Sequence, residues 1–176
     1  AIYTVGSDGL LLKWKFEVYG SKAARKDKTN KPELLSINLA VSRTLDISPD
    51  GNTLARAGDA DRILICDANT GQVVQELDAH KGRRIWQLGY TPSGDGIISA
   101  GDDGAGGTAI NYINMSGSTS PIIGKTPYRI TSIDVSSEGK YVAGIGKASE
   151  VYIWNIQNQR REFLLNDPQS DKHATA

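Results

Sequence analysis

The feature that most constrains this chain is a repeat of a little over forty residues, marked by a turn that ends in glycine. The turn is Pro49-Asp50-Gly51 in its clearest copy, and Gly94 and Gly139 end the same turn in LGYTPSG and IDVSSEG. The steps are 43 residues (51 to 94) and 45 residues (94 to 139). A period of this length indicates a supersecondary unit that stacks on copies of itself.

The stretch from Ser42 to His80 shows what one unit contains. Four short apolar runs, each closed by a turn rich in Gly, Asp, Asn or Pro, occupy 44–48, 53–57, 62–66 and 72–77. Such runs predict one four-stranded antiparallel meander. Because its strands carry apolar residues on both faces, the small sheet cannot stand alone. We therefore predict an all-β chain of β-propeller blades, with four antiparallel strands in a blade.

The same pattern divides the chain into a single partial propeller domain. The blades are expected at about 1–39, 40–79, 80–125 and 126–166, followed by a tail at 167–176. Residues 1–5 read as the second strand of a blade, so the first blade lacks its inner strand and the chain holds about 3.75 blades. The outer strand of the third blade, in MSGSTSPIIGKTP, should be a short and irregular edge.

Three segments carry a resemblance to a known family. YTVGSDGLLLKWKF, LARAGDADRILICD and VAGIGKASEVYIWN resemble the strand-turn-strand core of the WD-repeat β-propellers, and the resemblance covers nearly the whole chain. Near their ends the segments carry Trp14, Cys66 and Trp154, at the position where that family usually has Trp. The Asp that usually follows in the family is present here as Asp67. The resemblance implies a non-catalytic scaffold that binds protein partners.

His80, Ser99 and Asp103 have the residue types of an activated serine nucleophile. Ser99 falls inside a predicted strand, however, without the sharp turn that would expose its hydroxyl, which argues against catalysis. In WD-repeat propellers a His, a Ser, an Asp and a Trp at these positions form a buried hydrogen-bond network. The resemblance therefore implies a structural network of His80, Ser99 and Asp103, whereas the second blade has Arg56 at the Ser position.

One column of residues is a candidate surface for partner binding. Arg43, Trp86 and Thr131 each lie eight residues before the first-turn glycine, and Arg84 and Arg129 lie two positions before the last two of them. Arg and Trp are enriched at binding hot spots, and in the resembling family this rim is the usual docking surface. We predict a partner-binding rim of Arg43, Arg84, Trp86 and Arg129. The alternative is that Trp86 packs between blades.

Other clusters do not predict catalysis, a metal site or a cofactor. The turn carboxylates are expected to be solvated and too far apart between blades to hold a cation; they are Asp59, Asp61, Asp102 and Asp103. The glycines of 104–107 lack the Lys and the helix of a phosphate loop. The alternative function is an enzyme or small-molecule binder with a site in the central channel, built from Asp46, Gln87 and Asp134.

The charge balance and the length of the apolar runs argue against nucleic acid and a membrane as main partners. Twenty basic and twenty acidic residues leave no net charge to attract nucleic acid as a main partner, and no apolar run approaches the ~20 residues of a membrane span. The lone Cys66 favours an intracellular, cytoplasmic setting and is interpreted as a packed small hydrophobe. A basic insertion in the first blade, GSKAARKDKTNKP, is either a solvated loop or a contact for an acidic partner.

Both ends of the chain read as interrupted blades. In the resembling family a His at the place of His173 precedes the first strand of another blade. An incomplete ring would leave apolar sheet faces exposed at its two ends. We therefore expect either the remaining blades of a longer protein, which we favour, or a second copy that closes the ring.

Overall fold

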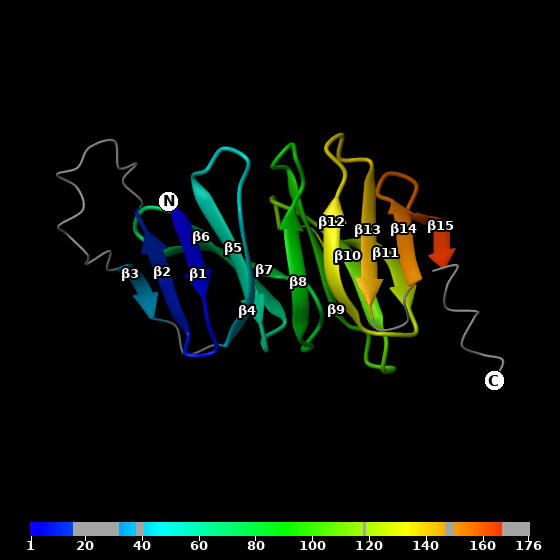
Figure 1. The fold of residues 1–176 in the computed structure, drawn as a ribbon, viewed down its shortest axis with the longest axis horizontal. Coiled ribbons are helices and arrows are strands. Elements are labelled where there is room, and N and C mark those ends of the chain that lie inside the picture. The colour runs from blue at the N-terminus through cyan, green and yellow to red at the C-terminus, as the bar shows by residue number, and fades with distance from the viewer. Residues whose placement is uncertain (16–31, 38–40, 118, 147–149, 167–176) are drawn as a thin grey trace, which may run out of the picture.

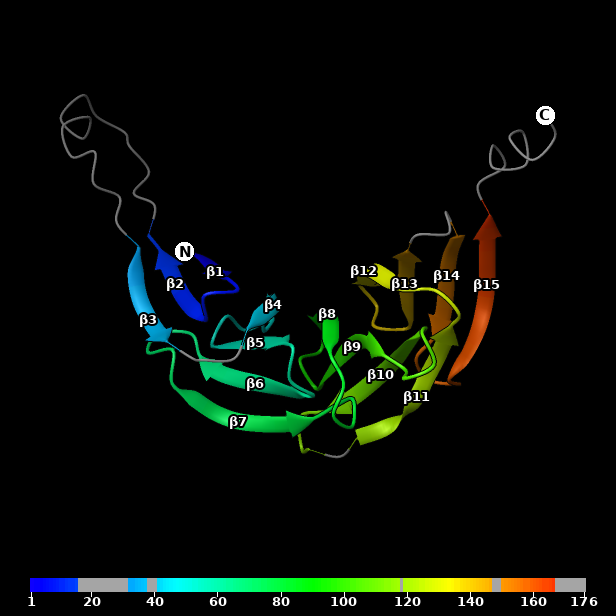
Figure 2. The same ribbon diagram turned by 90° about the horizontal axis from the view of Figure 1, so that it is seen from below.

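The computed structural model describes residues 1–15, 32–37, 41–117, 119–146 and 150–166. All regular structure within these residues is β-strand, arranged as four consecutive antiparallel sheets. The sheets stand side by side in an open arc (Figure 1, Figure 2). This confirms the predicted all-β fold of propeller blades. In the same residues we find no helix of the length and apolarity that a bilayer crossing requires.

Each sheet takes its strands in chain order, so neighbouring strands in a sheet are consecutive in the chain. The first sheet has three described strands: β1 (Ile2–Val5), β2 (Leu10–Trp14) and β3 (Glu33–Ile37). The second contains β4 (Ser42–Ile47), β5 (Thr53–Gly58), β6 (Arg62–Asp67) and β7 (Val73–Asp78). The third contains β8 (Ile85–Tyr90), β9 (Gly96–Asp102), β10 (Thr108–Asn114) and β11 (Thr119–Thr126). The fourth contains β12 (Ile130–Val135), β13 (Tyr141–Gly146), β14 (Glu150–Asn155) and β15 (Arg160–Asn166).

Apolar clusters fill the spaces between successive sheets. The first strands β4, β8 and β12 lie on the concave side of the arc, and the fourth strands β7, β11 and β15 lie on the convex side (Figure 2). Leu11 and Leu54 meet between the first two sheets, and Ile63 and Ile97 between the second and third. Trp154 belongs to the cluster between the third and fourth. Each blade is thus stabilised by its neighbours, as the repeat length predicts.

Three glycines at one position of the repeat bring two strands unusually close. Gly58 and Gly146 end β5 and β13, and Gly101 is the last residue but one of β9. A Cβ on any of them would overlap a backbone carbonyl oxygen of the residue that precedes the first strand of the same blade. Those oxygens belong to Val41, Arg84 and Arg129. Only glycine allows this approach. Next to each glycine, the first strand carries a β-bulge.

The outer strand of the third blade differs from the expectation of a short edge. β11 has eight residues, although its pairing with β10 shifts register twice. Ile123 explains the extra length, because its side chain is 2% exposed and packs in the cluster with Trp154. Burial against the next blade therefore keeps this segment in the sheet despite its prolines and glycines.

Two sequence predictions fall mainly outside the described residues. The basic insertion GSKAARKDKTNKP is described only at Pro32, and the tail with His173 lies beyond residue 166.

Candidate functional site

Two residues of the predicted rim, Arg43 and Trp86, occupy β-bulges, and Thr131 occupies the equivalent bulge in the fourth blade. Opposite β5, Ser42 pairs with Gly58 and Thr44 with Ala57, which leaves Arg43 as the extra residue of β4. Trp86 is the extra residue of β8, and Thr131 is the extra residue of β12. A bulge turns its unpaired side chain away from the regular alternation of the strand. The same distortion in three blades therefore presents these side chains at one edge of the arc.

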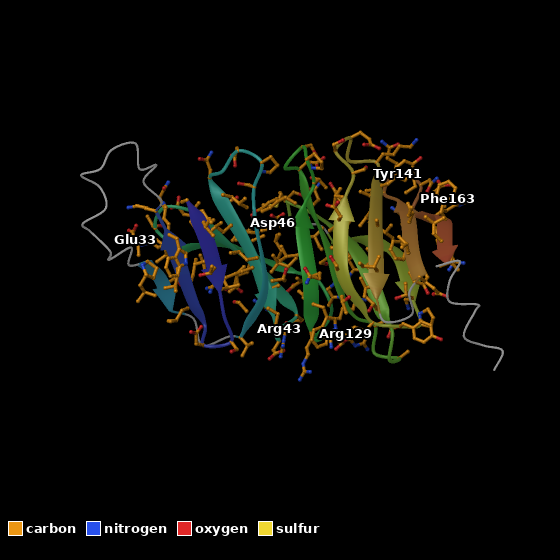
Figure 3. The ribbon with its side chains drawn as sticks, viewed as in Figure 1. Glu33, Arg43, Asp46, Arg129, Tyr141 and Phe163 are labelled. Atoms are coloured by element: carbon orange, nitrogen blue, oxygen red, sulfur yellow. The ribbon has the colours of Figure 1, made fainter. Side chains whose placement is uncertain are left out.

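The Trp86 indole is the centre of the rim. The guanidinium carbon of Arg129 lies 3.5 Å from the ring centroid, and those of Arg43 and Arg84 lie at 5.4 and 5.9 Å. Trp86 Nε1 donates a 2.5 Å hydrogen bond to Asp102 Oδ1. The side chains come from three successive blades, and Arg43 and Arg129 lie at the same edge (Figure 3). The structure thus brings together all four residues of the predicted rim, and half-buried Trp86 belongs to that surface.

Asp59 neutralises part of this positive cluster. Arg43 donates from Nε to Asp59 Oδ1 at 2.7 Å and from Nη2 to Oδ2 at 3.2 Å, and Arg84 Nε lies 3.4 Å from Oδ1. The hydrogen bond from Arg43 and the charges of both arginines lower the pKa of Asp59. The Arg43 side chain is still 40% exposed and that of Arg84 is 55% exposed. The rim is therefore ordered by these contacts and open to solvent.

His80 and Ser99 form the buried pair that the family resemblance implies. His80 Nε2 and Ser99 Oγ are 2.9 Å apart, and the two residues are 4% and 0% exposed. Gly101 leaves room for the ring, because a Cβ there would lie 2.7 Å from His80 Nδ1. The pair fastens the segment that enters the third blade to the second strand of that blade, and Ser99 is shielded from any substrate.

Asp103 does not join this pair. It follows β9, and its Oδ1 accepts the backbone N–H groups of Ala105 (2.7 Å) and Gly107 (2.9 Å), so the carboxylate organises its own hairpin turn. Sequence reasoning missed Asn111, a buried residue of β10 whose Nδ2 donates to the carbonyl of Ala79 at 2.7 Å. Its register opposite Ser99 is the signal that could have identified it.

Acid should weaken the fold through His80. Burial lowers the pKa of this imidazole from 6.5 to about 4. Between these values the unfolded chain binds more protons than the folded one, so stability is present above pH 6.5 and is lost as the pH falls toward 4. The loss amounts to roughly 3 kcal/mol. Urea unfolding at several pH values should show this slope, and His80→Gln should remove it. An equal slope in the variant would contradict this assignment.

The carboxylates proposed for a central-channel site are engaged in backbone contacts. Asp46 Oδ2 accepts from Tyr90 N at 2.7 Å and its Oδ1 accepts from Ile47 N at 2.9 Å, which ties β4 to β8. Asp134 Oδ1 accepts from Val135 N at 3.0 Å. Gln87 lies within 3.5 Å of Thr44 Oγ1. Among the residues that the structure covers, no three His, Cys, Asp or Glu side chains gather as metal ligands.

Comparison with known proteins agrees with this architecture. The family model described as WD domain, G-beta repeat matches residues 71–105. The matched segment runs from the end of the turn before β7 to the hairpin after β9, and it includes His80, Trp86 and Ser99. A search of curated proteins found no match.

Proposed function

We propose that this chain, which matches a WD repeat at 71–105, is a non-catalytic propeller segment that holds protein partners on the rim of Arg43, Arg84, Trp86 and Arg129. WD-repeat domains in general are protein-interaction scaffolds. The observation that carries the proposal is the convergence of arginines from three blades on one half-buried indole. Exposed Arg and Trp side chains held in place by their neighbours are characteristic of binding hot spots.

The hydrogen bonds already made by the candidate catalytic side chains support a scaffold over an enzyme. Ser99 is fully buried and bonded to His80, and Asp46 already accepts two backbone N–H groups. A general acid or base must reach the proton that it transfers. Two of the three channel candidates, Asp46 and Gln87, instead connect the second blade to the third.

The outer faces of the first and last sheets expose apolar side chains, which is the reason to propose further blades. On the last sheet, Ile145, Phe163 and Leu165 are 47%, 53% and 51% exposed, and the register places them on the face opposite Trp154. Phe163 lies at this end of the arc (Figure 3). On the first sheet, Ile2 is 54% and Leu34 is 51% exposed. Within the arc, such sheet faces are covered by the next blade, and we propose the same cover for these two.

Site-directed photo-cross-linking tests the rim in cells that make the protein. A photoreactive residue in place of Thr131, an exposed bulge residue beside the cluster, should cross-link protein partners. Arg84→Gln and Arg129→Gln should reduce the yield by about tenfold if each removes a charged hydrogen bond to the partner. The control position is Gln157, which is exposed in the turn between β14 and β15.

The control decides between two outcomes. Cross-links from position 131 that are absent from 157 and depend on the arginines support the proposal. Cross-links that form equally at both positions, or that persist in folded Arg84→Gln and Arg129→Gln variants, contradict it. Circular dichroism of each variant must show the β-sheet signal of the parent protein.

A further inference from the structure

The rim carries more arginine side chains than nearby carboxylates can pair with. Asp59 accepts from Arg43 and lies beside Arg84, and Asp102 accepts from the Trp86 indole. Within the described residues, no carboxylate comes within ion-pair distance of Arg129. The Arg84 side chain is 55% exposed and shares its acidic neighbour with Arg43. Two exposed guanidinium groups beside Trp86, those of Arg129 and Arg84, are therefore available to an external anion.

The contact with Trp86 restricts the Arg129 side chain before an anion binds. A guanidinium carbon 3.5 Å from the ring centroid is in direct contact with the π face, an attraction that strengthens as water is excluded. The N–H donors of arginine lie in the guanidinium plane and form a fork that matches a carboxylate. Less conformational freedom is then lost when the anion binds, because the indole already restricts the side chain.

The surroundings favour a peptide over a nucleic acid. The rim also carries Asp59 and Asp102, and the whole chain has no net charge, so a continuous phosphate backbone would meet repulsion as well as attraction. An acidic peptide can place single carboxylates at Arg129 and Arg84 and keep neutral residues over the aspartates. The open rim also offers one isolated anion few contacts, whereas a chain spans several blades.

We propose that the rim binds an acidic peptide segment, with one carboxylate received by Arg129 over Trp86 and a second by Arg84. The segment would cross the bulges of three successive blades. This inference rests on the proposed function and names the chemistry of the partner. Since the contacts are charged and exposed, binding should weaken as salt rises.

Fluorescence anisotropy with a labelled peptide of alternating Glu and Gly tests the inference on the whole chain. The same peptide with Gln for Glu is the matched control. The Glu peptide should bind, the Gln peptide should not, and Arg129→Gln should weaken binding by about tenfold or more. Arg62→Gln is the control variant, because Arg62 is exposed, is paired with Glu76 on the second blade and is not one of the four rim residues. The affinity of this variant for the Glu peptide should match that of the parent protein.

Three results would overturn the inference: no binding of the Glu peptide, equal binding to the Arg129→Gln variant, or tighter binding of a single-stranded oligonucleotide than of the peptide. The cross-linking experiment separates these from a failure of the proposed function. Partner cross-links at position 131 without Glu-peptide binding would remove the acidic chemistry and leave the rim as a docking surface. Loss of the cross-links as well would remove both.

Discussion

Truncation of Trp154 to alanine is expected to lower the free energy of unfolding by about 3 to 5 kcal/mol. The indole is 1% exposed and stacks on Tyr152, with ring centroids 5.6 Å apart. Gly124 and Gly144 leave the space that it fills, because a Cβ on either would contact the indole. The loss combines removal of apolar contacts between the third and fourth blades with the cavity that remains. Equilibrium unfolding in urea measures it.

Trp14 supplies the matched control. It closes β2 as Trp154 nearly closes β14, but it is only partly buried and its Nε1 donates to Thr4 Oγ1 at 3.1 Å. Trp14→Ala should lower stability by only about 1 kcal/mol, the value of one exposed hydrogen bond and limited packing. Equal losses for the two tryptophans would show that burial between blades does not determine stability in this arc.

Replacement of Arg56 by methionine is expected to raise stability, by on the order of 1 to 4 kcal/mol. Arg56 is 1% exposed, and among the described residues its Nε, Nη1 and Nη2 have no hydrogen-bond partner. It lies on the face of β5 that carries Leu54, which packs with Leu11 and Cys66. Burial raises the pKa of the Cys66 thiol, and Arg56 opposes this rise. A charge without a counterion in apolar surroundings destabilises the folded state.

Arg62→Met on the neighbouring strand is the comparison. Arg62 is exposed and paired with Glu76 and Asp78, so its replacement should change the free energy of unfolding by no more than about 0.5 kcal/mol. Guanidinium chloride unfolding of both variants gives the comparison. If Arg56→Met were the less stable protein, the guanidinium would have to make polar contacts that hold the first two blades together.

The fold could be predicted because the repeat acts at every level of the structure. The turn glycines set the period, the hairpin signals set the order of strands, and apolar residues on both strand faces required blade-to-blade stacking. The grouping of the rim residues could also be predicted, since Arg43, Trp86 and Thr131 recur at one position of the repeat, whereas partner binding by them stays a prediction. The sequence did not reveal that this position is a β-bulge. That follows from Gly58, Gly101 and Gly146, whose need for close backbone contact appears only in three dimensions.

The contacts of some residues could not be predicted from their spacing in the sequence. Asp103 could have bonded to His80 or to its own turn, and the backbone amides of the turn are nearer in the chain. Asn111 entered the buried region by its register opposite Ser99. The burial of Arg56 depends on the blade before it, because the residue type alone predicts exposure.

Light scattering on this polypeptide most directly tests the claim that the arc is part of a closed ring of blades. The exposed end faces predict a mass above that of one chain, increasing with concentration. Phe163→Asp should reduce the association, whereas Val74→Asp should not, because Val74 is also exposed (60%) but lies on β7 of an interior blade. A discrete dimer would assign the missing cover to a second copy in place of further blades. A stable monomer at all concentrations would contradict the account.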